Sequence, residues 1–258
     1  MRGPKPADVT CTPGLVNVQP DTALDAVQTL IFDVFGTLVD WRRCIAREAR
    51  AVLAADAPAL DGEAFADAWR ARYQPMMEEV RSGAIPFSKL DALHRRNLDH
   101  VLHALGLDDV PEATRIALNL AWHRLDAWPD VGPGLARLRT RFRIAPCSNG
   151  NISLMADLAR HNGWHWDAIV GAELARDYKP KPVVYLTAAA AFECAPAQVL
   201  MVAAHSSDLA AAAAAGLRTA FIARPDEHGP GRGEREASVP VDLSACSLTE
   251  LADRLGCA

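Results

Sequence analysis

The chain has 258 residues, of which 50% are hydrophobic and 23% are charged, and its formal net charge is -5. This acidic balance gives no reason to expect nucleic acid or an anionic membrane as a partner, and no apolar run approaches the roughly 18 residues that span a bilayer. Residues 1–24 are proline-rich and carry charges where a signal peptide needs an apolar stretch, so we expect an N-terminal tail on a soluble, cytoplasmic protein.

The six cysteines lie far apart and form no CxxC pair. Zinc sites need paired spacings, and disulfide scaffolds are smaller and denser in cysteine, so reduced thiols are the better interpretation.

The first predicted strand is Thr29–Asp33, a short apolar run that ends at a polar residue before Gly36. This pattern is typical of a buried parallel strand that ends at a functional loop. From 42 to 125 the apolar residues follow helical spacing and no convincing strand interrupts them. We therefore expect a helical cap domain at 42–125, inserted after the first strand.

Strand–helix alternation resumes after this block, and residues 25–41 and 126–258 are expected to form one α/β core, a doubly wound parallel sheet. The predicted strands cover 142–147, 168–171, 199–203 and 219–222, the last closing the series, and the predicted helices cover 152–160, 183–192 and 210–215. Ligands bind such sheets at the carboxyl ends of the strands. Asp33, Ser148, Asn149 and Asp208 fall at those ends, where the insert would cover them and exclude water.

The segment from Asp33 to Thr37 carries the strongest chemical signal. A carboxylate on a tight turn, with Gly36 permitting close backbone approach and Thr37 offering a hydroxyl, suits a nucleophile. A helix-capping aspartate is the structural alternative. With its later motifs, the chain resembles the haloacid dehalogenase superfamily from about Leu30 to Pro225, and the resemblance implies attack by Asp33.

Most members of that superfamily are magnesium-dependent phosphatases, so the branch needs an argument. Those enzymes have an acid two residues after the nucleophile, where this chain has Phe35, and another at the position of Ala204. An alkoxide leaves badly without a proton, and a phosphate dianion benefits from a cation beside a carboxylate. A halide needs neither, so the substitutions favour halide displacement with no metal and no cofactor.

The L-2-haloacid dehalogenases of the superfamily match further. The resemblance implies that Arg70 binds the departing halide, since a guanidinium is always charged and weakly hydrated; a solvated helix arginine is the alternative. It also implies substrate binding by Ser148 and Asn149 and by the backbone of Val34 and Phe35.

Three further residues of the resemblance concern the nucleophile. Lys179 would keep Asp33 ionised and stabilise the ester, Tyr185 would join the same network, and Asp208 would orient Lys179 and the hydrolytic water. Each residue has a structural alternative. Lys179 would be a surface lysine, Tyr185 a core aromatic, and Asp208 an acid that complements a helix dipole.

His205 departs from the better-studied enzymes, which have an asparagine there. A histidine is familiar from a type II subgroup that shares Asp40–Arg42 and the stretch 224–230 and has fluoroacetate-accepting members, although Ser206 replaces its usual asparagine. His205 would orient water, donate to departing fluoride, or only brace the loop, and the sequence does not decide among these roles.

The resulting hypothesis is a dehalogenase that converts short 2-haloacids to 2-hydroxyacids through an ester at Asp33. A phosphatase of the same superfamily and a catalytically idle carboxylate-binding protein are the alternatives. The resemblance leaves a homodimer open, and the halogen, chain length and enantiomer stay undetermined.

Overall fold

The computed structural model describes residues 24–258, and the predicted tail lies almost wholly outside them. Six parallel strands form one sheet in the order β3-β2-β1-β4-β5-β6. The strands are β1 (Thr29–Phe32), β2 (Arg143–Ser148), β3 (Val170–Gly171), β4 (Val199–Ala203), β5 (Arg218–Ile222) and β6 (Leu243–Ala245). The predicted parallel α/β class is confirmed.

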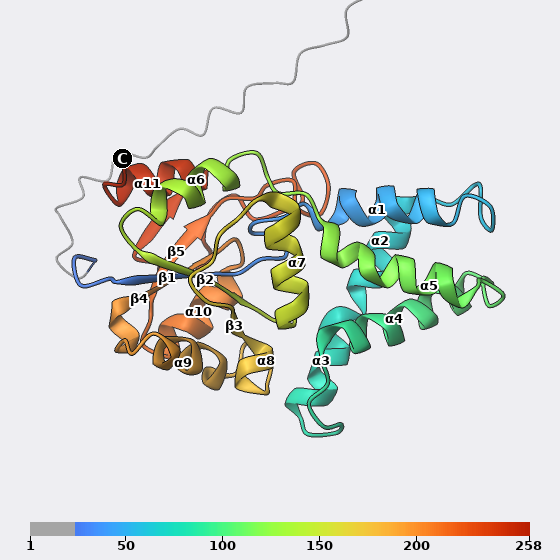
Figure 1. Cartoon of the computed structure of the whole chain (residues 1–258), viewed down its shortest axis with the longest axis horizontal. Coiled ribbons are helices and arrows are strands. Elements are labelled where there is room, and N and C mark those ends of the chain that lie inside the picture. The colour runs from blue at the N-terminus through green and yellow to red at the C-terminus, as the bar shows by residue number, and fades with distance from the viewer. Residues whose placement is uncertain (1–23) are drawn as a thin grey trace, which may run out of the picture.

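The sheet is buried on both faces because apolar side chains on successive strand residues point to opposite sides. All four residues of β1 are buried; Leu30 and Phe32 join one core cluster, whereas Ile31 joins the other. The helices of the core are α6 (Val131–Leu138), α7 (Ile152–Asn162), α8 (Ala172–Ala175), α9 (Pro182–Ala191), α10 (Ser206–Ala214) and α11 (Leu248–Arg254), with a 3-10 turn, η2 (Pro196–Gln198), before β4. In Figure 1, α6 and α11 lie on one side of the sheet and α9 and α10 on the other.

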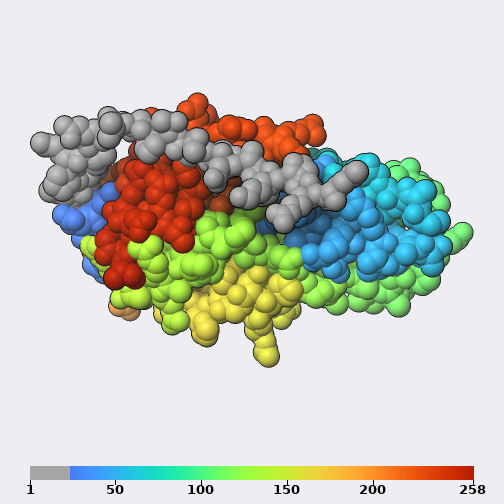
Figure 2. All heavy atoms as spheres, turned by 90° about the horizontal axis from the view of Figure 1, so that it is seen from above, coloured from blue at the N-terminus to red at the C-terminus, as the bar shows by residue number. Residues whose placement is uncertain are grey.

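The segment between β1 and β2 is helical, as expected. Its elements are α1 (Trp41–Val52), α2 (Gly62–Ala71), α3 (Tyr73–Arg81), α4 (Leu90–Ala104), α5 (Glu112–Asn119) and the 3-10 helix η1 (Leu120–Arg124). These helices gather at one end of the molecule, beyond the sheet (Figure 1), and the space-filling view shows an elongated molecule with the red C-terminal segment towards the other end (Figure 2). No helix among residues 24–258 is long and apolar enough to cross a membrane.

Two features correct the sequence-based picture. The strand at 219–222 does not close the series, because β6 follows and pairs with β5; its three residues, Leu-Ser-Ala, are too short and mixed to give a strand pattern. Helix α6 was not predicted, because Gly132, Pro133 and Gly134 are poor helix formers and hide its pattern in the sequence. Proline is tolerated in a first turn, where its missing N–H has no helical partner, and a Cβ on Gly134 would lie 2.4 Å from that of Leu248 in α11.

Candidate active site

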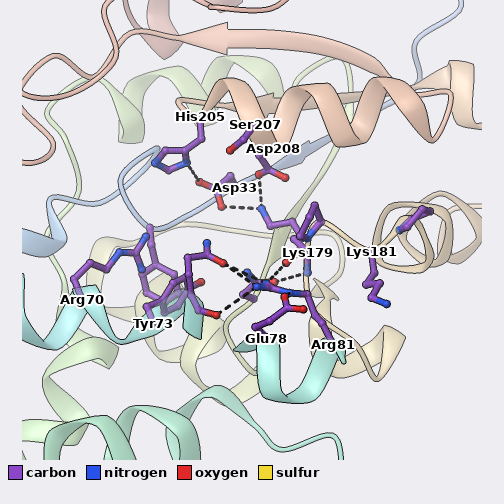
Figure 3. A pocket seen from close by; sticks show the side chains of 15 residues that line it. Asp33, Arg70, Tyr73, Glu78, Arg81, Lys179, Lys181, His205, Ser207 and Asp208 are labelled. Carbon is purple, nitrogen blue, oxygen red and sulfur yellow. Dashed lines mark hydrogen bonds and ion pairs between the residues drawn. The ribbon is translucent and has the colours of Figure 1, made fainter. Parts of the chain in front are cut away.

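A cavity of about 650 Å³ opens at the carboxyl ends of the strands, between the core and the inserted helices. Core side chains and side chains of α2 and α3 share its wall (Figure 3). Its lining residues are Asp33, Phe35, Arg70, Tyr73, Gln74, Glu78, Arg81, Asn149, Lys179, Pro180, Lys181, Pro182, His205, Ser207 and Asp208. The cavity therefore brings together side chains from distant parts of the chain.

Asp33 follows β1 directly, and both oxygens of its carboxylate are engaged by neighbouring side chains. Its Oδ1 accepts a hydrogen bond from Lys179 Nζ at 2.8 Å, and its Oδ2 accepts from Thr37 Oγ1 at 2.8 Å. Burial opposes the charged form, but the charge of Lys179 and the hydrogen bond from His205 outweigh it and hold the pKa of Asp33 well below its usual range. The carboxylate is thus kept ionised at neutral pH.

Lys179 is held between two carboxylates. Its Nζ also donates to Asp208 Oδ2 at 2.5 Å, and Tyr185 Oη donates to Asp208 Oδ1 at 2.5 Å. Burial lowers the pKa of Lys179, but the charges of Asp208 and Asp33 raise it above its usual value. The lysine is therefore a fixed cation beside Asp33, and Tyr185 and Asp208 fix its position.

His205 and Thr37 engage the other oxygen of Asp33. His205 Nδ1 lies 3.1 Å from Asp33 Oδ2, and Thr37 Oγ1 accepts a hydrogen bond from the backbone N–H of Ala204 at 2.9 Å. The turn that follows β1 is thereby tied to the loop that follows β4. His205 contacts the predicted nucleophile Asp33 directly, so it does more than stabilise the loop in which it lies.

Asn149 lines the cavity, and its Oδ1 accepts the backbone N–H of Lys179 at 2.9 Å. Ser148 is fully buried, and its Oγ accepts the N–H of Gly150 at 3.0 Å. Ser148 and Val34 are not among the lining residues, although Phe35 is. Their substrate-binding roles stay predictions.

Arg70 lies on α2, and its guanidinium group is surrounded by aromatic rings. Its guanidinium carbon lies 4.0 Å from the ring centroid of Tyr73, 5.2 Å from that of Trp41 and 5.9 Å from that of Phe35. Its Nη1 is buried and finds no hydrogen-bond partner among residues 24–258, as is also true of Trp122 Nε1. Both groups pack near Phe35, whose ring centroid lies 5.7 Å from that of Trp122. Unpaired buried donors of this kind favour an anionic ligand.

Several residues at this site could not be singled out from the sequence. Glu227 is buried and contacts His205, and Arg81 Nη1 donates to the carbonyl of Lys179 at 2.8 Å, which connects α3 to the core. The loop that carries Glu227 has no periodicity, and Arg81 looks like any surface arginine of a helix. Only the tertiary fold reveals these contacts.

A second buried ion pair supports the nucleophile turn. Arg224 donates from Nη1 and Nη2 to the two carboxylate oxygens of Asp130 at 2.9 Å each, and from Nε to the carbonyl of Thr37 at 2.8 Å. Asp130 also accepts the N–H of Leu248, at the start of α11, at 2.7 Å. One guanidinium thus links the turn after β1 to α6 and α11.

The donor set at the carboxylate disfavours a divalent cation there. Lys179, Thr37 and His205 take up both oxygens of Asp33, and the acids of the phosphatase pattern are replaced by Phe35 and Ala204. Among residues 24–258, no group of three or more His, Cys, Asp or Glu side chains is placed to hold a metal ion.

Comparisons with known proteins find a matching family and several similar proteins. Residues 27–216 match the haloacid dehalogenase-like hydrolase family. The chain is 26% identical to (S)-2-haloacid dehalogenase 1 of Pseudomonas sp. (strain CBS-3) over 78% of this chain and 86% of that protein. It is 25% identical to haloacetate dehalogenase H-2 of Moraxella sp. (strain B) over 77% and 86% of the two chains.

Two solved structures are more similar in sequence. The defluorinating L-2-haloacid dehalogenase Rha0230 is 45% identical with a TM-score of 0.87, covering 89% of this chain and 95% of its own. The L-2-haloacid dehalogenase PA0810 is 42% identical with a TM-score of 0.85, covering 89% and 99%.

Proposed function

Because the chain belongs to the haloacid dehalogenase-like hydrolases, we propose that it is a metal-independent dehalogenase of short 2-haloacids, including haloacetates and L-2-haloacids, that releases 2-hydroxyacids. The observation that carries the proposal is the pairing of Asp33 with Lys179 at 2.8 Å, in a site without the two acids of the phosphatase pattern. The similar haloacid dehalogenases point to the same chemistry.

In the first step Asp33 attacks the carbon that bears the halogen, and the carbon–halogen bond breaks as the ester bond forms. Lys179, Thr37 and His205 hold the carboxylate in place. A near-attack pose of nucleophile and carbon contributes up to roughly 7–11 kcal/mol. Attack in line inverts the carbon, so an L-substrate gives a D-2-hydroxyacid.

The halide leaves towards Arg70. The unpaired Nη1 of Arg70 is a buried donor that suits an anion. Asn149, Ser148 and the backbone of Val34 and Phe35 complete the proposed substrate site. Fluoroacetate belongs to the proposed substrates, supported by the similarity to the defluorinating enzyme Rha0230.

In the second step water attacks the aspartyl ester carbonyl, so the oxygen delivered to the product comes from Asp33. Asp208 keeps Lys179 beside the ester, and Tyr185 keeps Asp208 in place. Residues 42–125 act as the cap domain over the core of 25–41 and 126–258, supported by the shared wall of the cavity.

The test is halide release from fluoroacetate, chloroacetate and both enantiomers of 2-chloropropionate, with EDTA present and with Asp33→Asn as the blank. Release by the wild type alone is the expected result. A single turnover in ¹⁸O-water should put the label into Asp33, and label in the hydroxyacid instead would rule out the ester route.

The homodimer and the cytoplasmic location stay predictions of the sequence. Light scattering during size-exclusion chromatography tests the first, and cell fractionation tests the second.

A further inference from the structure

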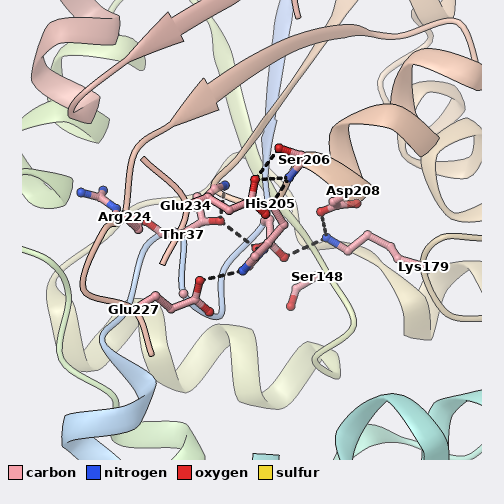
Figure 4. Close-up of polar contacts among 12 residues, drawn as sticks. Thr37, Ser148, Lys179, His205, Ser206, Asp208, Arg224, Glu227 and Glu234 are labelled. Carbon is pink, nitrogen blue, oxygen red and sulfur yellow. Dashed lines mark hydrogen bonds and ion pairs between the residues drawn. The ribbon is translucent and has the colours of Figure 1, made fainter. Parts of the chain in front are cut away.

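The ring of His205 lies between two carboxylates that come from different loops. Nδ1 faces Asp33 Oδ2 at 3.1 Å, and Nε2 faces Glu227 Oε2 at 2.9 Å. Figure 4 shows Glu227 pointing at this ring from the side opposite Lys179 and Asp208. Both ring nitrogens are therefore occupied, and the ring has one orientation.

The side chain of Glu227 is buried and is held by other contacts besides the one to His205. Its side chain is only 2% exposed, and its Oε1 accepts a hydrogen bond from Trp41 Nε1 at 3.0 Å. The backbone of Gly36, at φ 88°, packs directly on this carboxylate, because a Cβ there would lie 2.1 Å from Oε1. The glycine of the nucleophile turn thus makes room for Glu227.

Glu227 cannot act on the substrate directly, since it is not among the residues that line the cavity. In the first step Glu227 acts on Asp33 only through His205, and Lys179 and Thr37 hold Asp33 independently of that ring. A buried charge is costly unless it is paired. Its nearer ionisable partner is His205, at 2.9 Å, and His205 also lines the cavity. Any role of Glu227 in the reaction therefore passes through that ring.

We propose, on the basis of the function proposed above, that Glu227 is a positioning residue that holds His205 as the base for hydrolysis of the Asp33 ester. A carboxylate on the far nitrogen of a histidine fixes the tautomer and orientation of the ring and stabilises the imidazolium that forms.

The proton balance of this step is simple. Burial lowers the pKa of His205, but the hydrogen bonds to Asp33 and Glu227 outweigh it and raise the pKa to about 10, so the resting ring is protonated. Ester formation removes the charge of Asp33, which lowers the pKa of His205, and the ring releases one proton to solvent. Haloacid has by then become ester and free halide.

Nδ1 next accepts a proton from water as the water oxygen bonds to Cγ of Asp33. The bond between Cγ and the ester oxygen breaks, and the departing alkoxide takes the proton from Nδ1. The carboxyl group of Asp33 then returns its own proton to Nδ1. The sum is haloacid plus water giving hydroxyacid, halide and one proton.

The charged groups around this pair set the expected pH dependence. Asp33 and Glu227 face His205, Lys179 lies across Asp33, and His228 Nε2 lies 3.6 Å from Glu227 Oε2. Burial raises the pKa of Glu227, but the hydrogen bond from His205 and the charges of His205, His228 and Arg70 outweigh it and lower the pKa below its usual value. At neutral pH Glu227 is therefore a carboxylate.

The test is rapid-quench kinetics with chloroacetate, in which chloride release reports ester formation and intact-protein mass spectrometry reports the carboxymethyl ester. In Glu227→Gln we expect chloride release in the first turnover to persist, while ester hydrolysis slows on the order of 10- to 100-fold, part of the roughly 10²–10⁴-fold that a general base contributes. The ester should accumulate on Asp33, and the acid limb of the hydrolysis rate should move to lower pH.

Asp226→Asn is the matched control, because it removes a neighbouring charge of the same loop and keeps the acceptor for the N–H of Gly231. In a His205→Asn background, Glu227→Gln should have no further effect on hydrolysis. Equal slowing of both steps, no accumulation of ester, or an undiminished effect in that background would overturn the role of Glu227. If the wild type releases no chloride from chloroacetate and forms no ester, the proposed function fails as well.

Discussion

Replacing Arg224 by methionine tests how the nucleophile turn is held. The substitution keeps an apolar stem of similar length but removes three donors, two to Asp130 and one to the carbonyl of Thr37. The side chains of Arg224 and Asp130 are only 8% and 16% exposed. Asp130 would keep a single donor, the N–H of Leu248.

Breaking a buried ion pair from one side costs about 3–5 kcal/mol, because the remaining charge is left uncompensated. Since water reaches part of Asp130, we expect Arg224→Met to lower the free energy of unfolding by about 3 kcal/mol. For a chain of this size that corresponds to a fall in Tm of roughly 6–12 °C. Adding Asp130→Asn removes the stranded charge and keeps an acceptor for Leu248, so the double variant should regain part of the loss.

Urea unfolding followed by circular dichroism measures both variants, provided that the m-value is unchanged. A free energy of unfolding within about 0.5 kcal/mol of wild type for Arg224→Met, the usual range of an unimportant surface change, would refute the reasoning. Strict additivity of the two substitutions would refute it too, since residues in direct contact should couple.

Three other substitutions bear on the site itself. Lys179→Met should slow ester formation on the order of 10²–10³-fold, measured as single-turnover halide release, because it removes the cation 2.8 Å from Asp33; an unchanged rate would contradict that role. Burial lowers the pKa of His205, but its two carboxylate partners raise it from 6.5 to about 10. The stability that His205 contributes should therefore be complete below pH 6.5 and lost as the pH rises through 10. The free energies of unfolding of wild type and His205→Asn, measured across this range, should converge as the pH rises. A constant difference between them would contradict the prediction. Gly36→Ala should lower the free energy of unfolding by about 1–3 kcal/mol, since the new Cβ would meet Glu227 at 2.1 Å; unfolding equal to wild type would show that the carboxylate moves aside at little cost.

Much of the sheet could be predicted because a buried parallel strand is a continuous apolar run, as in β1 and β4. The predicted bounds 199–203 of β4 agree with the structure, and 142–147 differs from β2 by one residue at each end. The short edge strand β6 and the glycine-rich α6 give no such pattern. Their formation depends on packing against β5 and α11, which is tertiary information.

At the site, sequence motifs identified the groups nearest Asp33: Thr37, Lys179, His205 and Asp208 all join its network. Thr37 and His205 lie just beyond the ends of β1 and β4, which the alternation of strands and helices locates. Lys179 lies in the segment before α9 and Asp208 in the first turn of α10, so these two were identified from the resemblance. Glu227 was missed because it lies in an irregular loop, and its importance comes only from what it touches. Tyr73 begins α3, and its role at the site likewise comes only from what it touches, since its ring packs against the guanidinium of Arg70.

The placement of β1 between β2 and β4 has a consequence for how the protein is made. A ribosome completes Asp33 early, but Lys179 is 146 residues further along the chain and His205 is 172. Loops of that length close late, because the chain entropy of closure must be overcome before the contact contributes. In a nascent or truncated chain that lacks Lys179 and His205, the carboxylate of Asp33 is therefore unreactive. Ester formation at Asp33 during synthesis or refolding would show that the strands on both sides of β1 have assembled.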